Sequence, residues 1–446
     1  MPALPYSKKR YYLSGIDWII SAINSYMRSV SPAGNHSSLV IELDAPPEAE
    51  KLTQCLDSIF SALPPLSGRT ARDKLNLCPY FRVKPGAGGN YQFAEHEVKD
   101  DGSFNLLLDT ILNTPFPDEK THLMFSLIKF GAETCELRSF LVMTFDHRIL
   151  DARGAELFLN LLAEMGNDKL TARLKRIKIT DAPELRDWNK QFDAGRKVQR
   201  KIISLTQDGC FCPSEFTMNN IMPRKTPNLT HYFRTFSEQE TEVLLENAEK
   251  KAGYMMETPY LLAAAALTVH KIFAGGKTEN YFVPVPIDVR AKGDESRLLL
   301  FNHLSFLFFY FKISHATTED ELICELRRQL FIQIGEDFPD LMIKAANPGR
   351  IFPFFFLKKV MRYPMQGKMS SFVFANVGES SCTGGDIASC GIRNIMHMPR
   401  IPTPPGLGLF FSRFNGKMNM TVTADNSALP KGTAEQVIEV FSEGRI

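Results

Sequence analysis

Apolar residues recur with a helical period at the start of the chain, directly after Ser14. The spacing from Ser14 to Asp17 is that of a capping box, which marks the first turn of a helix. A short apolar run over 39–43 predicts a strand, and from Pro46 to Leu63 apolar positions again recur at three- and four-residue intervals. This pattern predicts a chain that opens with helix, strand and helix.

A second group of elements surrounds a short polar segment. Residues 140–145 predict a buried strand, and apolar positions from Gly154 onward predict a helix, with Asp146 to Asp151 between them. From about residue 178 to residue 230 the periodicity is lost, and Lys, Arg and Pro residues accumulate. This stretch is typical of a linker that crosses between domains.

The second half repeats the mixture of helices and strands. Helices are predicted after Ser237, Thr258 and Thr318, strands over 281–287, 298–313 and 371–376, and a hairpin over 407–423 with its turn at Asn415-Gly416. We therefore predict a mixed α/β protein with an N-terminal half (1–180), a crossing linker (181–230) and a C-terminal half (231–446).

Composition and charge exclude several classes of protein. The 446 residues are 44% hydrophobic, which is enough for a sizeable core, and the net charge of +2 argues against a protein that coats nucleic acid. Eight scattered cysteines and the lack of a secretory leader predict a reduced, cytoplasmic protein. The most apolar window, 298–313, is too short to span a bilayer, so we expect no transmembrane segment.

The candidate chemistry lies at His147 and Asp151, on the turn that follows the predicted strand over 140–145. A rigid strand end can hold a histidine at a cleft, where an imidazole can accept a proton from a hydroxyl, amine or thiol. Asp151 could contact the imidazole or pair with an arginine. By spacing alone, a surface histidine and a solvated aspartate are the better explanation of the pair, because four-residue patterns occur by chance. No nucleophile elbow, phosphate loop or dinucleotide loop is present.

Five segments in this order resemble the condensation-domain-like, coenzyme-A-dependent acyltransferases. This superfamily includes chloramphenicol acetyltransferase, plant acyltransferases of the BAHD type, peptide-synthetase condensation domains and wax-ester synthases. The segments are the opening to Arg69, Asp146-His-Arg-Ile-Leu-Asp-Ala-Arg-Gly154, Pro284-Val-Pro-Ile-Asp-Val-Arg290 with the later Asn302, Ser371-Phe-Val-Phe-Ala-Asn-Val-Gly378, and the hairpin that ends at Asp425. The resemblance covers nearly the whole chain.

The resemblance implies a fold and a reaction. The expected fold is α/β, an α+β sandwich of two chloramphenicol acetyltransferase-like halves, each a mixed β-sheet flanked by helices, with an active-site channel between them. The implied function is acyl transfer from a thioester donor to a hydroxyl or amine acceptor. The donor would be either acyl-CoA or the phosphopantetheine thioester of an acyl-carrier protein. His147 would be the general base, Asp151 and Arg290 would support the active site, and Asn302, Asn376 and Gly154 are candidate channel-lining residues. No metal and no permanently bound cofactor are expected.

Two departures from the family pattern leave a second hypothesis open. Asp146 stands where condensation domains usually have a second histidine, and Ala152 stands where the motif has glycine, with Gly154 two positions later. The alternative is a non-catalytic, condensation-like binding or partner module with a degenerate active-site motif. Hydrolysis by bound water is a further option.

A Phe-rich run over 351–357 is followed by Lys358, Lys359 and Arg362. Peripheral contact with a membrane or a lipid acceptor is one interpretation, and core packing with a solvated basic edge is another. The same basic run would also suit coenzyme A phosphates or an acidic acyl-carrier protein. The expected partners are therefore a small-molecule or lipid acceptor and a carrier protein, without nucleic acid.

Overall fold

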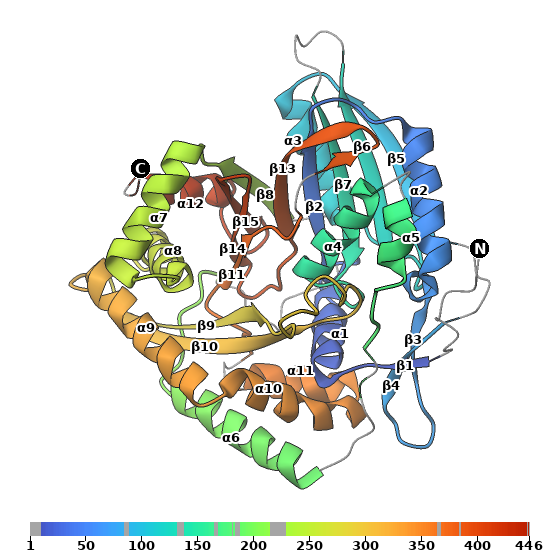
Figure 1. Cartoon of the computed structure of the whole chain (residues 1–446). Helices are drawn as coiled ribbons and strands as arrows, with labels where there is room; N and C mark the ends of the chain where they lie inside the picture. Colours follow the sequence, from blue (N-terminus) through green and yellow to red (C-terminus); the bar gives the residue numbers. More distant parts are fainter. Residues whose placement is uncertain are drawn as a thin grey trace.

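The computed structural model describes residues 10–83, 89–131, 138–164, 168–180, 182, 188–214, 229–363, 367–382, 385–443 and 445. The helices described there are α1 (Gly15–Arg28), α2 (Ala49–Ala62), α3 (Asp101–Asn113), α4 (Ala152–Ala163), α5 (Asp168–Leu174), α6 (Trp188–Thr206), α7 (Glu238–Ala252), α8 (Glu257–Phe273), α9 (Glu319–Gly335), α10 (Phe338–Ala346), α11 (Phe354–Arg362) and α12 (Thr433–Ser442), with short 3-10 helices at Pro64–Ser67 and Asn347–Ile351. The strands are β1 (Arg10–Tyr12), β2 (His36–Leu43), β3 (Arg69–Arg72), β4 (Pro79–Arg82), β5 (Tyr91–Val98), β6 (Leu123–Phe130), β7 (Ser139–Asp146), β8 (Leu229–Thr235), β9 (Glu279–Asp288), β10 (Leu304–Ile313), β11 (Val373–Glu379), β12 (Asp386–Ile387), β13 (Cys390–Pro399), β14 (Leu407–Phe414) and β15 (Lys417–Asp425). The predicted α/β class is confirmed (Figure 1).

The first half is built around a six-stranded sheet in the order β12-β13-β2-β7-β6-β5. Every residue of β7 is buried, and successive side chains enter different cores. Leu141 and Met143 pack in the core shared with α2 and α4, whereas Phe140 and Val142 pack in the core shared with α3. Because β7 is fixed from both faces, the turn that follows it at residue 147 starts from a rigid point.

One strand of this sheet comes from the far end of the chain. β13 pairs antiparallel with β2, with His397 opposite Leu39 and Pro399 opposite Ser37. The two halves therefore share a sheet as well as an interface, as Figure 1 shows where β13 lies beside β2. The division of the chain at 181–230 stays a prediction, and this exchange was not part of it.

The second half contains a four-stranded sheet in the order β11-β14-β15-β8 and the paired strands β9 and β10. β14 and β15 meet at the predicted hairpin turn, where Asn415 and Gly416 both have positive φ angles (48° and 74°). Two central residues with positive φ are what a tight primed turn requires, and Asn-Gly satisfies this at low cost. Buried residues of α7, α8, α9 and α12 join these strands in one large core.

Pro284 and Pro286 do not interrupt β9. The backbone of Phe282 faces away from β10, since its carbonyl accepts from the amide of Ser371 and its amide donates to the Ser371 hydroxyl. Pro284 and Pro286 lie two and four residues further on, so their missing N–H groups also face away from β10. The ladder between β9 and β10 therefore loses no hydrogen bond to proline.

The prediction of one buried strand over 298–313 is wrong in its first third. β10 begins only at Leu304, and Phe301 has a φ angle of 71°, outside strand geometry. The amides of Asn302 and His303 donate to two buried carboxylates, of Asp17 and Asp151, instead of joining a ladder. Side-chain acceptors thus override the β propensity of this apolar stretch.

The predicted linker is partly helical. α6 occupies residues 188–206, although its apolar positions are few; Ala194 and Val198 are its buried contacts with α10 and its surroundings. Five of its 19 residues are lysine or arginine, and they stand between apolar positions that do recur at helical spacing (Ala194, Val198, Ile202 and Leu205). The linker residues 181, 183–187 and 215–228 lie outside the described residues. Among the described helices, none is both long and apolar enough to cross a bilayer.

Candidate active site

His147 lies on the turn between β7 and α4. Its side chain is half-buried, and the turn is closed by the amide of Ile149 donating to the carbonyl of Asp146. α4 then begins with Asp151 as its N-cap, whose Oδ1 accepts from the amide of Gly154 at 2.7 Å. Aspartate favours this position because it satisfies an otherwise unpaired amide of the first turn.

Asp151 forms a buried ion pair with Arg290, which follows β9. Arg290 Nη2 lies 2.7 Å from Asp151 Oδ1, and the two side chains are only 1% and 5% exposed. Asp151 Oδ2 also accepts from the backbone amide of His303 at 2.8 Å. Burial alone would raise the pKa of Asp151, but the Arg290 charge and these donors hold the pKa below its usual value. The structure thus brings together the two residues that sequence reasoning assigned to support.

His147 Nδ1 lies 3.2 Å from Asn302 Oδ1. The orientation of this amide is decided by its other end, because Asn302 Nδ2 donates to Asp17 Oδ1 at 3.1 Å and to the His147 carbonyl at 3.0 Å. Asn302 Oδ1 therefore faces His147 as an acceptor, and the ring carries its proton on Nδ1. No hydrogen-bond partner among the described residues occupies Nε2, which presents its lone pair.

Asp17, in the first turn of α1, also belongs to the site. The sequence predicted only its part in the capping box with Ser14. Its Oδ2 accepts from the amide and hydroxyl of Ser14, as that box requires. Its Oδ1 accepts from both the backbone and side-chain amides of Asn302, at 2.9 and 3.1 Å. Burial raises the pKa of Asp17, and these donors oppose the rise by stabilising the ionised carboxylate. No sequence signal connects residues 17 and 302.

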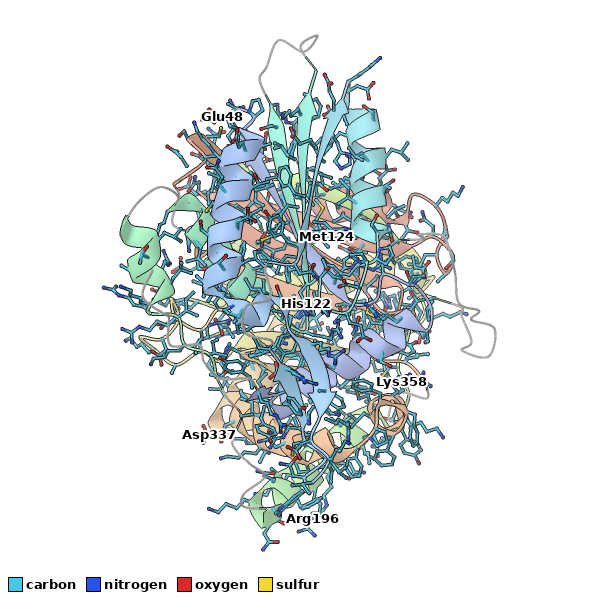
Figure 2. The ribbon with its side chains drawn as sticks, turned by 90° about the vertical axis from the view of Figure 1, so that its right-hand side faces the viewer. Glu48, His122, Met124, Arg196, Asp337 and Lys358 are labelled. Atoms are coloured by element: carbon cyan, nitrogen blue, oxygen red, sulfur yellow. The ribbon has the colours of Figure 1, made fainter. Side chains whose placement is uncertain are left out.

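Asp146 points away from the histidine that follows it. Its carboxylate accepts from the guanidinium of Arg148 and lies 2.9 Å from His122 Nδ1, while His122 Nε2 lies 2.8 Å from the Gly68 carbonyl. Figure 2 labels His122 near the middle of the molecule. Burial alone would raise the pKa of Asp146, but Arg148 and His122 hold the pKa well below its usual value. Asp146 is therefore used inside the fold to hold the turn.

Arg153 ties the site to the C-terminal half, and Asn376 joins two elements within that half. Arg153, on the first turn of α4, donates to the carbonyls of Val377 and Glu379 in β11. Asn376, a predicted channel residue, donates to Glu257 and Thr258 at the start of α8. Its contacts are those of a residue that joins two elements, and its place in a channel stays a prediction.

Gly154 is buried against the 298–303 segment. A Cβ atom at this position would lie 2.4 Å from the Leu299 carbonyl oxygen, which is too close for any side chain. The structure therefore gives a packing reason for the glycine that follows the motif. His303, next to Asn302, has its Nε2 3.1 Å from the Leu300 carbonyl, within its own segment.

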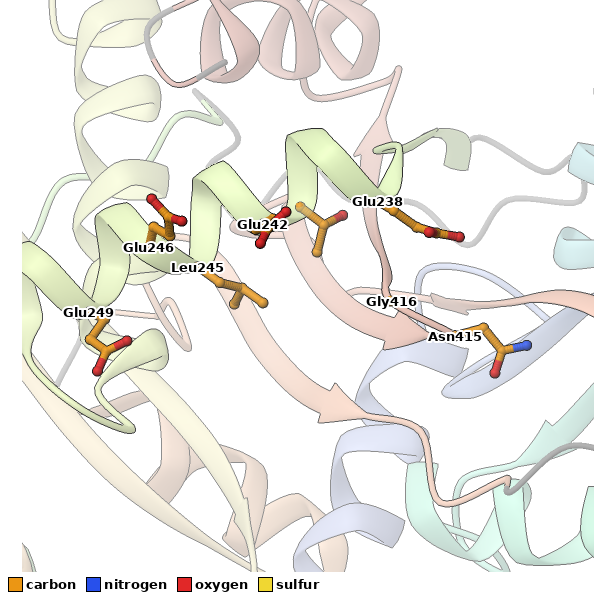
Figure 3. Close-up of a pocket in the computed structure, with 8 residues that line it drawn as sticks. Glu238, Glu242, Leu245, Glu246, Glu249, Asn415 and Gly416 are labelled. Atoms are coloured by element: carbon orange, nitrogen blue, oxygen red, sulfur yellow. The ribbon is translucent and has the colours of Figure 1, made fainter.

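Grooves elsewhere on the described surface share no residue with this site. One, of about 460 Å³, follows α7 and is lined by Glu238, Glu242, Glu246 and Glu249 with the β14–β15 turn (Figure 3). Among the described residues, no group of three or more His, Cys, Asp or Glu side chains is arranged to hold a metal ion. The expected channel between the halves stays a prediction.

Comparisons by sequence find no match, either to a family model or to a curated protein. Comparison with solved structures finds matches over nearly the whole chain. The trichothecene 15-O-acetyltransferase from Fusarium sporotrichioides superposes with a TM-score of 0.67 at 11% identity, over 98% of this chain and 95% of that one. The first condensation domain of the calcium-dependent antibiotic synthetase gives 0.66 at 13% identity, over 98% and 96%. This chain has the condensation-domain and acyltransferase fold.

Polyketide synthase associated protein 5 from Mycobacterium tuberculosis has the same fold, with a TM-score of 0.62 at 12% identity over 97% of this chain and 96% of that one. The two-lobed architecture expected from the motifs is thereby confirmed over almost the full length. Because identities are this low, the shared property is the fold, and the chemistry rests on the residues around His147.

We expect Gly154→Ala to destabilise the protein by about 1–3 kcal/mol, because the added methyl group must displace the Leu299 carbonyl. Urea denaturation would measure the loss. The matched control is Gly195→Ala within α6, where a Cβ meets nothing within 4 Å; there alanine should stabilise the helix by about 0.5–1 kcal/mol. Equal stability of the Gly154→Ala variant and wild type would contradict this account.

We expect Arg290→Leu to lower the free energy of unfolding by about 3–5 kcal/mol, because Asp151 would be left buried without its partner. Arg328→Leu, which breaks an exposed pair with Glu325, should cost less than about 1 kcal/mol. The folded-state pKa of Asp151 is lowered, so its contribution is present above about pH 4 and is lost as the pH falls through the folded pKa. The difference in the free energy of unfolding between wild type and Arg290→Leu, measured by urea denaturation, should therefore become smaller in acid. An unchanged gap would argue against this role.

Proposed function

We propose that this protein is an acyltransferase that moves an acyl group from a thioester donor to a hydroxyl or amine acceptor, with His147 as the general base. The observation that carries the proposal is the state of the His147 ring. Nδ1 is engaged by Asn302, and Nε2 has no hydrogen-bond partner among the described residues. An imidazole held in this tautomer is prepared to accept a proton at Nε2.

The reaction balances with His147 as its only proton carrier. Nε2 takes the proton of the acceptor hydroxyl or amine as its oxygen or nitrogen bonds to the thioester carbonyl carbon. The C–S bond then breaks, and the departing thiolate takes the proton from the imidazolium. The protein's task is to align the two substrates and carry one proton, which suits a fixed histidine on a rigid turn.

Asn302 and Asp17 would serve His147 at a distance. When Nε2 is protonated, the ring becomes positive, and its Nδ1–H bond to Asn302 Oδ1 strengthens. Asp17 keeps the amide in the orientation that offers Oδ1, and its carboxylate places a negative charge behind the amide. We assign both as positioning residues, since neither is proposed to touch substrate.

Structural neighbours support the class of chemistry. One is an O-acetyltransferase, and others are condensation domains of peptide and polyketide synthases. We therefore propose acyl-CoA or a phosphopantetheine thioester on an acyl-carrier protein as donor, and a small molecule or lipid as acceptor. The donor is a substrate, and the proposal includes no permanently bound cofactor.

We expect wild-type protein to release thiol from one or more donors in a panel of short- to long-chain acyl-CoA thioesters when alcohol and amine acceptors are added. His147→Ala should reduce this acceptor-dependent release by about 10²–10⁴-fold, the usual contribution of a general base. His315→Ala, which removes an exposed histidine after β10, is the matched control and should keep the wild-type rate.

The same assay separates the two hypotheses. If neither wild type nor variant releases thiol, with acyl-carrier donors included, the catalytic proposal is wrong. Calorimetric binding of the thioesters by such an inactive protein would instead favour the condensation-like binding module, for which the Ala152 departure is the motivating observation.

We expect Asn302→Ala to slow transfer by roughly ten- to a hundredfold, the range for losing a hydrogen bond to a charged group. Nitrogen NMR of the His147 ring should show the proton on Nδ1 in wild type and both tautomers in the variant. Asn426→Ala is the matched control: it removes an amide that contacts Thr230 and should change neither the transfer rate nor the His147 tautomer. A slower variant whose ring keeps the single wild-type tautomer would contradict the positioning role.

A further inference from the structure

α11 has two apolar faces, of which the fold buries one. Phe354 stacks on Trp18 of α1 with ring centroids 4.2 Å apart, and Leu357 is buried beside it. The opposite face is solvent-exposed: Phe355 is 67% exposed, Val360 50%, and Tyr363, just after the helix, 80%. A surface helix ordinarily presents polar residues on its outer face, so this second apolar stripe is unpartnered.

The exposed stripe of α11 is surrounded by cations. Among the described residues, Lys358, Lys359 and Arg362 have no acidic partner, although Lys358 donates to the Ser25 hydroxyl at 3.5 Å and the Arg362 guanidinium lies 5.2 Å from the centroid of the Tyr26 ring. A groove of about 570 Å³ separates α11 from the end of α6 and is lined by Ile203, Thr206, Gln207, Lys359, Arg362, Tyr363 and Gly367. Apolar and positively charged side chains of α6 and α11 thus line the same groove.

The positive charge is concentrated on these helices. Together α6 and α11 contain eight lysine and arginine residues and one aspartate, while the whole chain has a net charge of only +2. In Figure 1, α6 forms the lower edge of the molecule and α11 lies above it, next to α10; Figure 2 shows Arg196 at the lower tip with Lys358 above it to one side. The rest of the chain is therefore net negative, and the charge asymmetry selects an anionic partner for this edge.

We propose that this edge binds an anionic phospholipid bilayer. The α6–α11 surface consists of Arg200, Ile203, Phe355, Phe356, Lys359, Val360, Arg362 and Tyr363. Its cations would pair with lipid phosphates, and its Phe and Val side chains would enter the boundary between headgroups and acyl chains. Cations without an acidic partner beside exposed phenyl rings on a helix are the combination that an interfacial membrane helix uses. The proposal does not depend on acyl transfer.

Co-sedimentation of the full chain with lipid vesicles tests the proposal. We expect binding to vesicles of phosphatidylcholine with phosphatidylserine, weak binding to phosphatidylcholine alone, and release at high salt. Lys359→Gln should lower the partition coefficient about fivefold, the effect of one cation near an anionic surface. Phe355→Ser combined with Phe356→Ser should lower it roughly tenfold.

Matched controls lie on other helices. Leu106→Ser changes an equally exposed apolar residue on α3, and Lys250→Gln neutralises an exposed lysine on α7; both should bind vesicles like wild type. The proposal is overturned if wild type ignores phosphatidylserine, or if the double Phe variant binds as well as wild type. It is also overturned if the surface binds only an acidic acyl-carrier protein, or if sedimentation velocity shows a dimer that the double variant disrupts while vesicles remain unbound.

Discussion

The candidate site depends on one buried negative charge, the carboxylate of Asp151. A carboxylate removed from water must be compensated where it lies, and Asp151 is compensated only when three separate segments are in place. They are the first turn of α4, which supplies the Gly154 amide; the end of β9, which supplies Arg290; and the segment before β10, which supplies the His303 amide. Any one of them out of position would leave a buried charge only partly compensated, so the turn that holds His147 forms together with its surroundings.

A second buried carboxylate completes this arrangement from the other side. Asp17 binds the backbone amide of Asn302, and Asp151 binds the next amide along the chain, that of His303. Successive amides thus donate to different carboxylates, and Phe301 takes a positive φ angle just before them. The position of Asn302 relative to His147 is consequently determined by the first helix of the chain and by α4, and the backbone cost of the turn is offset by two charge-assisted bonds.

The sequence predicted part of the secondary structure and the two residues of the Asp151–Arg290 pair. It predicted few of the contacts that surround this pair. Periodicity, capping residues and the Asn415-Gly416 turn predicted about half of the described helices and strands; these signals act within a few residues. The resemblance suggested the pairing of Asp151 with Arg290. The role of Asp17 could not be predicted, since its capping box explains only one of its oxygens. The exchange of β13 into the first sheet depends on packing between distant segments. α6 was missed although Ala194, Val198, Ile202 and Leu205 recur at helical spacing, because the prediction for this stretch gave more weight to its Lys, Arg and Pro residues.

The departure from the condensation-domain pattern at Asp146 bears on whether His147 can act as a base. An acid beside a catalytic histidine would compete for its proton if both side chains faced the same space. Here Asp146 is an interior residue of the sheet, and its charge is matched by Arg148 and His122. The carboxylate therefore braces the turn from within, while the His147 ring is directed to Asn302 on the other side. With aspartate at this position, the contacts to Arg148 and His122 hold the turn, and the His147 Nε2 lone pair stays unengaged among the described residues.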